Sequence, residues 1–138
     1  MDHGGTTSSS IELHDSHVAG IALSGDCVIV HLRPAYVHRS EGRPGIDPGS
    51  GWVQDLDMVV SEAMLVSRFS KMSRDLDDGS LSVGNEVFEN IVPLPIDVRG
   101  AVCFSAVSQS ERLIIQGTRA TVVSIGDARY VEPFPGTR

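Results

Sequence analysis

The stretch that decides the fold is Ala101-Val-Cys-Phe-Ser-Ala-Val-Ser-Gln-Ser-Glu-Arg-Leu-Ile-Ile-Gln116. Two apolar runs, rich in β-branched residues, flank its polar centre, and this is the pattern of a β-hairpin. Beyond it, Gly117 and the pair Gly126-Asp127 separate further apolar runs. Apolar strand-like runs that are separated by turn residues and recur at spacings of about 8–12 residues predict an antiparallel meander in a sandwich or barrel. We therefore expect a hairpin over 100–117 and a closing pair of strands over 119–133.

A second hairpin is predicted near the start of the chain. Two extended runs, 11–23 and 27–38, flank the turn sequence Ser24-Gly25-Asp26. Both faces of the second run are mainly apolar near its centre, which is typical of a strand set in a sandwich or barrel wall. Pro34 is expected to end the regular pairing of this run or to place it at an edge.

The middle of the chain contains the clearest loop and one more long strand. Residues 41–51 include four glycines and two prolines, which favour turns and prevent a continued ladder. Apolar and polar residues alternate over 52–64, with Asp55 and Asp57 on the solvent side. We favour a strand here, with a helix over 59–69 as the alternative because its apolar spacing also fits a helical period.

These patterns together predict an all-β fold. We expect an antiparallel sandwich or barrel-like domain of about eight to ten strands, with little helix. Residues 11–138 form its single domain, and the Gly/Ser-rich residues 1–10 form a flexible tail.

Composition limits the partners and the compartment. The net charge is −7, the only lysine is Lys71, and the ten arginines are scattered, so we expect neither nucleic-acid nor membrane binding. No apolar run is long enough to span a bilayer, and no basic segment precedes a hydrophobic one, so a cytoplasmic location is the expectation. Cys27 and Cys103 lie in apolar strand-like runs and are expected to be buried free thiols.

Three segments carry a resemblance to known proteins. They are Glu12-Leu-His-Asp-Ser16, His31-Leu-Arg-Pro-Ala-Tyr-Val-His38 and Ala128-Arg-Tyr-Val-Glu-Pro-Phe134. The chain resembles a group of small uncharacterised bacterial β proteins over most of residues 11–134. Its Leu-His-Asp opening is also similar to that of several domains described as contact-toxin immunity proteins. The resemblance supports a β domain and leaves its function open, and it brings no catalytic residue with it.

The first hairpin gathers polar residues at one end. If its two runs form one ladder, residues whose numbers sum to about 50 face each other, so His17 lies opposite Arg33 and His14 opposite Tyr36. This register places five side chains near the start of the first strand: Asp15, His17, Arg33, Tyr36 and His38.

Trp52 is the residue most typical of a binding surface. It is the only tryptophan and follows the Gly/Pro loop directly, and aromatic anchors beside adaptable loops serve recognition. The alternative is that Trp52 covers the open end of the core. The predicted binding residues are Arg33, Tyr36, Trp52, Asp55 and Asp15.

Metal binding by His17 and His38, with Asp15, is a weaker hypothesis. Imidazole and carboxylate suit Zn²⁺, Ni²⁺ or Fe²⁺ when three such side chains converge. No spacing here matches a defined metal motif, and the cupin pattern is absent. Hydrogen-bonded structural histidines, with Asp15 capping nearby backbone donors, are the favoured interpretation.

The sequence thus favours a non-enzymatic binding or interaction module, immunity-like, with no cofactor and no assigned catalytic residue. The alternative is a small-molecule-binding or metal-dependent enzyme that uses Asp15, His17 and His38. The partner is an unidentified protein or small molecule. Exposed strand edges also leave a homodimer open.

Overall fold

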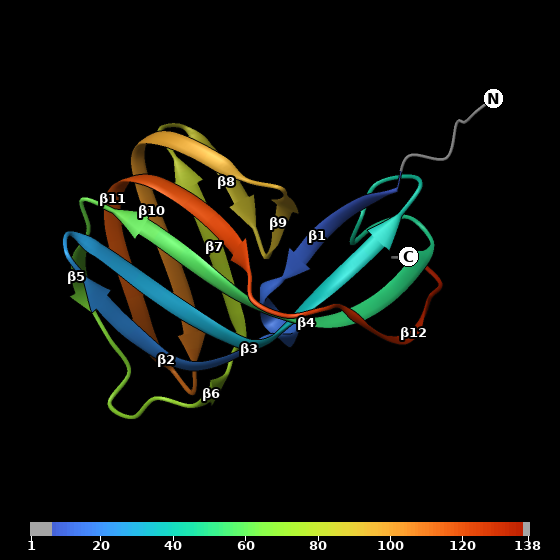
Figure 1. Cartoon of the computed structure of the whole chain (residues 1–138), viewed down its shortest axis with the longest axis horizontal. Helices are drawn as coiled ribbons and strands as arrows, with labels where there is room; N and C mark the ends of the chain where they lie inside the picture. Colours follow the sequence, from blue (N-terminus) through green and yellow to red (C-terminus); the bar gives the residue numbers. More distant parts are fainter. Residues whose placement is uncertain (1–6, 137–138) are drawn as a thin grey trace.

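The computed structural model describes residues 7–136 and is almost entirely antiparallel β-structure, which confirms the predicted all-β class. One 3-10 turn is the only helical element in that range, and no helix there is long and apolar enough to cross a membrane. Figure 1 shows the elements, which are β1 (Ser8–Glu12), η1 (Leu13–Asp15), β2 (His17–Ser24), β3 (Cys27–Ser40), β4 (Gly49–Ser61), β5 (Met64–Ser67), β6 (Arg74–Asp75), β7 (Asp78–Val83), β8 (Glu86–Glu89), β9 (Ile91–Leu94), β10 (Asp97–Ser108), β11 (Glu111–Ser124) and β12 (Arg129–Phe134).

Eight strands form a curled half-barrel in the order β6-β2-β3-β4-β11-β10-β7-β8. The described residues contain twelve strands, more than the predicted eight to ten. The difference comes from short pieces such as β5 and β6, of four and two residues. Segments this short show almost no alternation of apolar and polar residues, so the sequence pattern does not reveal them.

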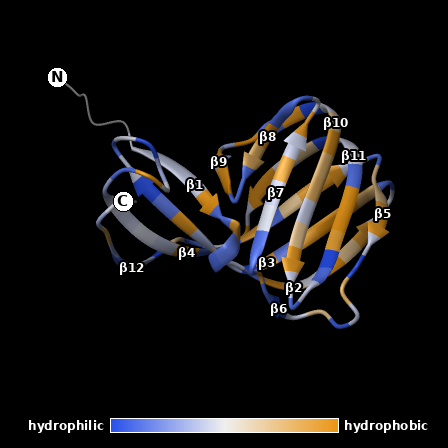
Figure 2. Cartoon of the chain, turned by 180° about the vertical axis from the view of Figure 1, so that it is seen from behind, coloured by the Kyte–Doolittle hydropathy of each residue, from blue (hydrophilic) through white to orange (hydrophobic). Residues whose placement is uncertain are grey.

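Alternate side chains of the long strands fill the half-barrel. In β4, Leu56, Met58 and Val60 are fully buried, while the residues between them are partly exposed. Phe104 of β10 and Ile115 of β11 are fully buried in the same apolar cluster. Figure 2 shows the hydrophobic residues concentrated along barrel strands such as β3 and β10. Each such side chain contributes about 1.5–3 kcal/mol when it leaves water, which makes this cluster the main source of stability.

β3 and β4 continue past the half-barrel into a second region. A register shift between Leu32 and Ala35 marks the place where the β3–β4 ladder changes. Beyond it, β1 pairs with β3 on one side and β12 pairs with β4 on the other. This region projects from the half-barrel in Figure 1. We call it the arm, and it consists of β1, residues 35–40, residues 49–54 and β12.

The first predicted hairpin forms from Val18 to Leu32, but the predicted register fails outside this range. β2 pairs with β3 from Val18 opposite Leu32 to Ser24 opposite Cys27, close to the predicted alignment. His17, however, lies opposite Asp75 of β6 and not opposite Arg33. β6 is a two-residue strand, so its pairing with β2 left no signal in the sequence.

The turn η1 interrupts the predicted strand 11–23. The backbone N–H of Leu13 donates to the carbonyl of Asn90 at 2.8 Å, and the Leu13 side chain is fully buried. The chain leaves the ladder here, so Glu12 lies opposite Tyr36 in place of the predicted His14.

The described structure begins its first strand earlier than the predicted domain start at residue 11. Ser8–Ser10 are not part of a flexible tail, because they belong to β1 and pair with Ser40, Arg39 and His38 of β3. The three serines show no alternation of apolar and polar residues, so the sequence pattern did not indicate a strand here. Residues 1–6 of the predicted tail lie outside the described residues.

The hairpin over 100–117 is confirmed as β10 and β11, which turn at Gln109 and Ser110. The closing pair over 119–133 is wrong, because β12 pairs with β4 and not with β11. The predicted strand 52–64 is confirmed over most of its length as β4, and Glu62, in the left-handed region at φ 48°, follows its end.

Candidate functional site

One face of the arm holds an arginine on an aromatic platform. The Arg39 guanidinium carbon lies 4.2 Å from the centroid of the Trp52 ring, a cation–π contact. Trp52 is itself fixed, because its indole N–H donates to Ser50 Oγ at 2.8 Å and its ring meets Tyr130 edge-on at 5.5 Å between centroids. The platform therefore holds the guanidinium in place without neutralising it.

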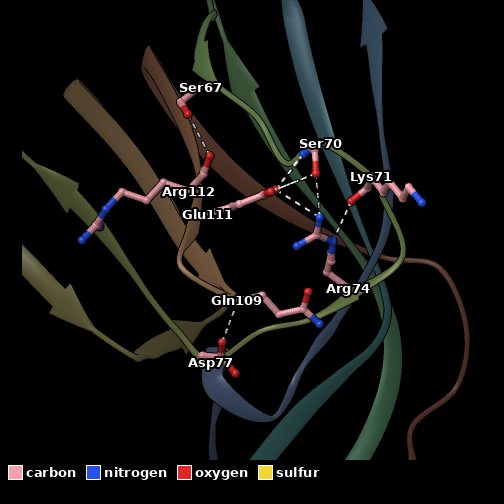
Figure 3. A network of polar contacts seen from close by, with 8 residues as sticks. All are labelled: Ser67, Ser70, Lys71, Arg74, Asp77, Gln109, Glu111 and Arg112. Carbon is pink, nitrogen blue, oxygen red and sulfur yellow. Dashed lines mark hydrogen bonds and ion pairs between the residues drawn. The ribbon is translucent and has the colours of Figure 1, made fainter.

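Arg39 forms no ion pair with a carboxylate within residues 7–136. Arg74 shows the contrasting case (Figure 3): its side chain bonds to Glu111 at 3.0 Å, to Ser70 at 3.1 Å and to the Lys71 carbonyl at 2.8 Å. The bonds that Ser70 donates to Glu111, together with those from Arg74, hold the pKa of that carboxyl below its usual range. Arg74 is thus occupied by a structural network, whereas the Arg39 guanidinium has no ion-pair partner among residues 7–136.

The surface around Arg39 is hollowed. Three hollows share Thr7 and Arg39; two have a volume of about 350 Å³ and the third of about 390 Å³. Apolar side chains line one of the two smaller hollows, among them Val37 of the arm, Leu56 of β4 and Leu94 of β9. Besides Arg39, the polar groups around the hollows are one carboxylate, one amide and several hydroxyls: Glu41, Gln54, Thr7, Ser9, Ser40, Ser50 and Ser124. We call this surface the Arg39 hollow.

Strand register explains why these residues meet. Arg39 lies opposite Ser9 of β1 on one side and opposite Ser50 of β4 on the other, and directly opposite residues project from the same face of a sheet. Val37 and Trp52 are opposite each other one step further along the same face. The sequence-based prediction missed Arg39, because only the pairing of β3 with both β1 and β4 places it beside Trp52.

Of the predicted binding residues, only Trp52 borders the Arg39 hollow. Arg33 donates to Asp57 at 2.9 Å and to the Leu56 carbonyl at 2.8 Å, so its guanidinium is already paired. Burial raises the pKa of Asp57, but the bonds from His31 and Arg33 outweigh it and leave that pKa below its usual range. Arg33 therefore belongs to a structural ion pair.

Tyr36, Asp15 and Asp55 lie away from the hollow. Tyr36 is opposite Glu12 and Val53, and its hydroxyl donates to Glu132 at 2.9 Å. Burial, and then the Glu132 carboxylate, raise the pKa of this phenol well above its usual value. The five predicted binding residues thus do not form one surface.

The two histidines predicted as metal ligands are held by separate partners. His17 Nδ1 lies 2.7 Å from Asp75 and its Nε2 lies 3.1 Å from Ser73. His38 is completely buried against Phe134, with 3.9 Å between ring centroids, and its Nδ1 accepts the backbone N–H of Gly45. Burial lowers the pKa of His38. Within residues 7–136, Asp15, His17 and His38 do not form a three-ligand group.

A different group of potential ligands lies beside η1. Glu12, His14 and Asp15 each place a ligand atom within 4.8 Å of the other two. The pKa of Glu12 is raised, first by burial and also by the Asp15 and Glu132 carboxylates, while His14 acts in the opposite direction. The prediction missed this group because a strand sends His14 to one face and Asp15 to the other. The 3-10 turn instead brings them together.

Cys27 and Cys103 are free thiols, as predicted, but both are half-buried where the sequence predicted buried side chains. Comparisons with protein-family models, with curated proteins and with solved structures gave no match. The likeness to bacterial β proteins and to immunity proteins therefore stays a prediction. The chemistry of the Arg39 hollow is the feature from which a function can be inferred.

Proposed function

We propose that this chain is a non-enzymatic binding module whose arm holds an acidic group of a partner protein in the Arg39 hollow. The single observation that carries the proposal is the Arg39 guanidinium, fixed over Trp52 at 4.2 Å without a carboxylate partner in residues 7–136. A guanidinium presents a planar fork of donors that fits a carboxylate with two parallel hydrogen bonds.

The surroundings of Arg39 support recognition of a protein side chain. Tryptophan and arginine are the residues most enriched where a few contacts supply most of the binding free energy. Hydroxyls of Ser9 and Ser50 flank the guanidinium and can donate to the remaining lone pairs of a bound carboxylate. A cavity of about 350 Å³ accommodates one anchoring side chain and its neighbours more readily than a large cofactor.

The overall charge favours a partner with a basic surface around that acidic anchor. With a net charge of −7, the chain attracts basic proteins at long range. Arg39 then favours one orientation of the bound partner, because it is a local positive charge on an acidic protein and attracts the partner's acidic group. An immunity-like role, in which the module covers a toxin domain, is one interaction of this kind. A metal-dependent enzyme built on Asp15, His17 and His38 has less support, since each histidine is bonded to its own partner.

The test begins with affinity capture from the native cell, using the full chain as bait, followed by titration calorimetry with the captured protein. We expect Arg39→Gln to weaken binding about 10- to 100-fold, the equivalent of about 1.5–3 kcal/mol for charged hydrogen bonds. Trp52→Ala should weaken it as well, because the guanidinium loses its platform. Arg129→Gln is the matched control, since it removes the same charge from an exposed position of β12.

Two results contradict the proposal. One is a partner that binds Arg39→Gln as tightly as the unchanged chain. The other is an equal loss of affinity in Arg39→Gln and Arg129→Gln, which would show that only net charge matters.

A further inference from the structure

The junction between the arm and the half-barrel brings three metal-ligating side chains together. η1 follows β1 directly, so Glu12, His14 and Asp15 come from one tight turn and its entry. Their ligand atoms lie within 4.8 Å of one another, and no other group of this kind occurs within residues 7–136. One ion can contact all three after small rotamer adjustments, because bonds from Zn²⁺ to nitrogen or oxygen are about 2.0–2.2 Å long.

Glu12 is the member of the group that points to a ligand. It is only 5 % exposed, and its Oε2 has no hydrogen-bond partner among the described residues. No lysine or arginine of that range forms an ion pair with it. Its other charged neighbours include Glu132, which accepts the Tyr36 hydroxyl. A buried carboxylate without a donor is costly, and a cation beside it removes that cost.

The other two side chains give an ion access from solvent. The side chains of His14 and Asp15 are 42% and 50% exposed, and His14 Nε2 lies 3.0 Å from Asp15 Oδ2. The group therefore has an exposed side, formed by His14 and Asp15, and a buried side, formed by Glu12. One imidazole with two carboxylates suits Zn²⁺ or Mn²⁺ better than Mg²⁺ or Ca²⁺, which bind oxygen almost exclusively.

We propose that Glu12, His14 and Asp15 form a binding site for a divalent transition metal, with water at the remaining positions. This site shares Asp15 with the sequence-based hypothesis but has Glu12 and His14 in place of His17 and His38, and it does not depend on the Arg39 hollow. A metal ion bound by these three residues fixes the turn that joins β1 to β2. The ion therefore stabilises the junction of the arm and the half-barrel.

Asn90 sets the affinity of the site through the tautomer of His14. The backbone N–H of His14 donates to Asn90 Oδ1 at 2.8 Å, so the amide nitrogen of Asn90 faces His14 Nδ1, at 2.7 Å. Nδ1 accepts there, and the ring proton sits on Nε2. A metal at Nε2 requires that proton to leave and Nδ1 to carry one, and Asn90 must then turn away. Asn90→Asp removes the conflict, because a carboxylate accepts from both the backbone N–H and Nδ1–H.

The test is calorimetric titration of Zn²⁺ into the metal-free full chain, in a His3→Ala background that removes the histidine near the N-terminus as a competing ligand. We expect one Zn²⁺ per chain, at least tenfold weaker binding in Glu12→Gln and in His14→Ala, and about 10- to 100-fold tighter binding in Asn90→Asp. His17→Ala is the matched control, because His17 also contacts a carboxylate but belongs to no three-ligand group. Co²⁺ absorption spectra of the same variants report the ligand set independently of affinity.

His14 is exposed, so His14→Ala keeps the test valid even if Glu12→Gln unfolds the protein. The proposal is overturned if the chain binds no stoichiometric Zn²⁺. It is also overturned if His14→Ala leaves the affinity unchanged, or if His17→Ala lowers it as much as His14→Ala does.

Discussion

Acidification should destabilise this protein through His38, and the structure gives the sign and the size of the effect. His38 is completely buried, its Nδ1 accepts the backbone N–H of Gly45, and its Nε2 has no partner among the described residues. Burial therefore lowers the pKa of the folded ring. In the unfolded chain the ring takes up a proton near its ordinary pKa of about 6.5. Below that pH the unfolded state binds a proton that the folded state does not, so the free energy of unfolding falls.

The magnitude follows from this linkage. Each pH unit below about 6.5 costs up to about 1.4 kcal/mol while the folded ring stays neutral. Between pH 7.5 and pH 5.0 the loss therefore reaches up to about 2 kcal/mol. Domains of this size have total stabilities of about 5–15 kcal/mol, so the change is readily measured.

The assay is urea unfolding at pH 7.5, 6.5, 5.5 and 5.0, followed by the fluorescence of the single tryptophan, Trp52. The comparison protein is His38→Asn, whose side-chain oxygen can still accept from Gly45 but does not titrate. Other titrating groups, including Glu12 with its opposite sign, cancel in the difference between the two proteins. Parallel loss of stability in both proteins across this range would refute the reasoning, because it would assign the pH dependence to other groups.

Two further changes test the packing. Gly51→Ala places a methyl group against the Tyr36 hydroxyl and breaks its bond to Glu132, so we expect a loss of about 1.5–3 kcal/mol in urea unfolding. Gly20→Ala, where an added methyl group meets nothing within 4 Å, is its control and should change stability little. Phe104→Ala empties a fully buried position of the half-barrel and should cost about 3–5 kcal/mol. An unchanged unfolding midpoint in that variant would show that Phe104 lies outside the cooperative core.

The sequence predicted those parts of the fold that depend on neighbouring residues. The β10–β11 hairpin was predicted because its polar turn and both apolar runs lie within one short stretch. The β12–β4 pairing was missed because its register joins Tyr130 to Trp52, far away in the chain. The turn at Leu13 was missed for the same reason, since its backbone N–H bonds to the distant carbonyl of Asn90. Pairing between segments far apart in the chain produces no pattern of apolar and polar residues that would identify the partner of either segment.

The candidate sites divide in the same way. Trp52 was predicted from its place beside the Gly/Pro loop, but Arg39 gained significance only from its pairing with Ser9 and Ser50. The shift between Leu32 and Ala35 also changes which residues of β3 face β4, so the faces beyond it do not follow from simple alternation. Glu12 and His14 are close in sequence, but no sequence pattern indicated the 3-10 turn that brings them together with Asp15.

The continuity of β3 and β4 has a mechanical consequence. Both strands continue from the Arg39 hollow, across the register shift between Leu32 and Ala35, into the half-barrel, where they pair with β2 and β11. A pull on a partner held at Arg39, directed along the arm, is therefore carried as tension along the strand axes. Ladder hydrogen bonds lie perpendicular to those axes, so such a pull loads many of them in shear at once and does not peel them apart one by one. The arm is thus expected to resist force applied along its length.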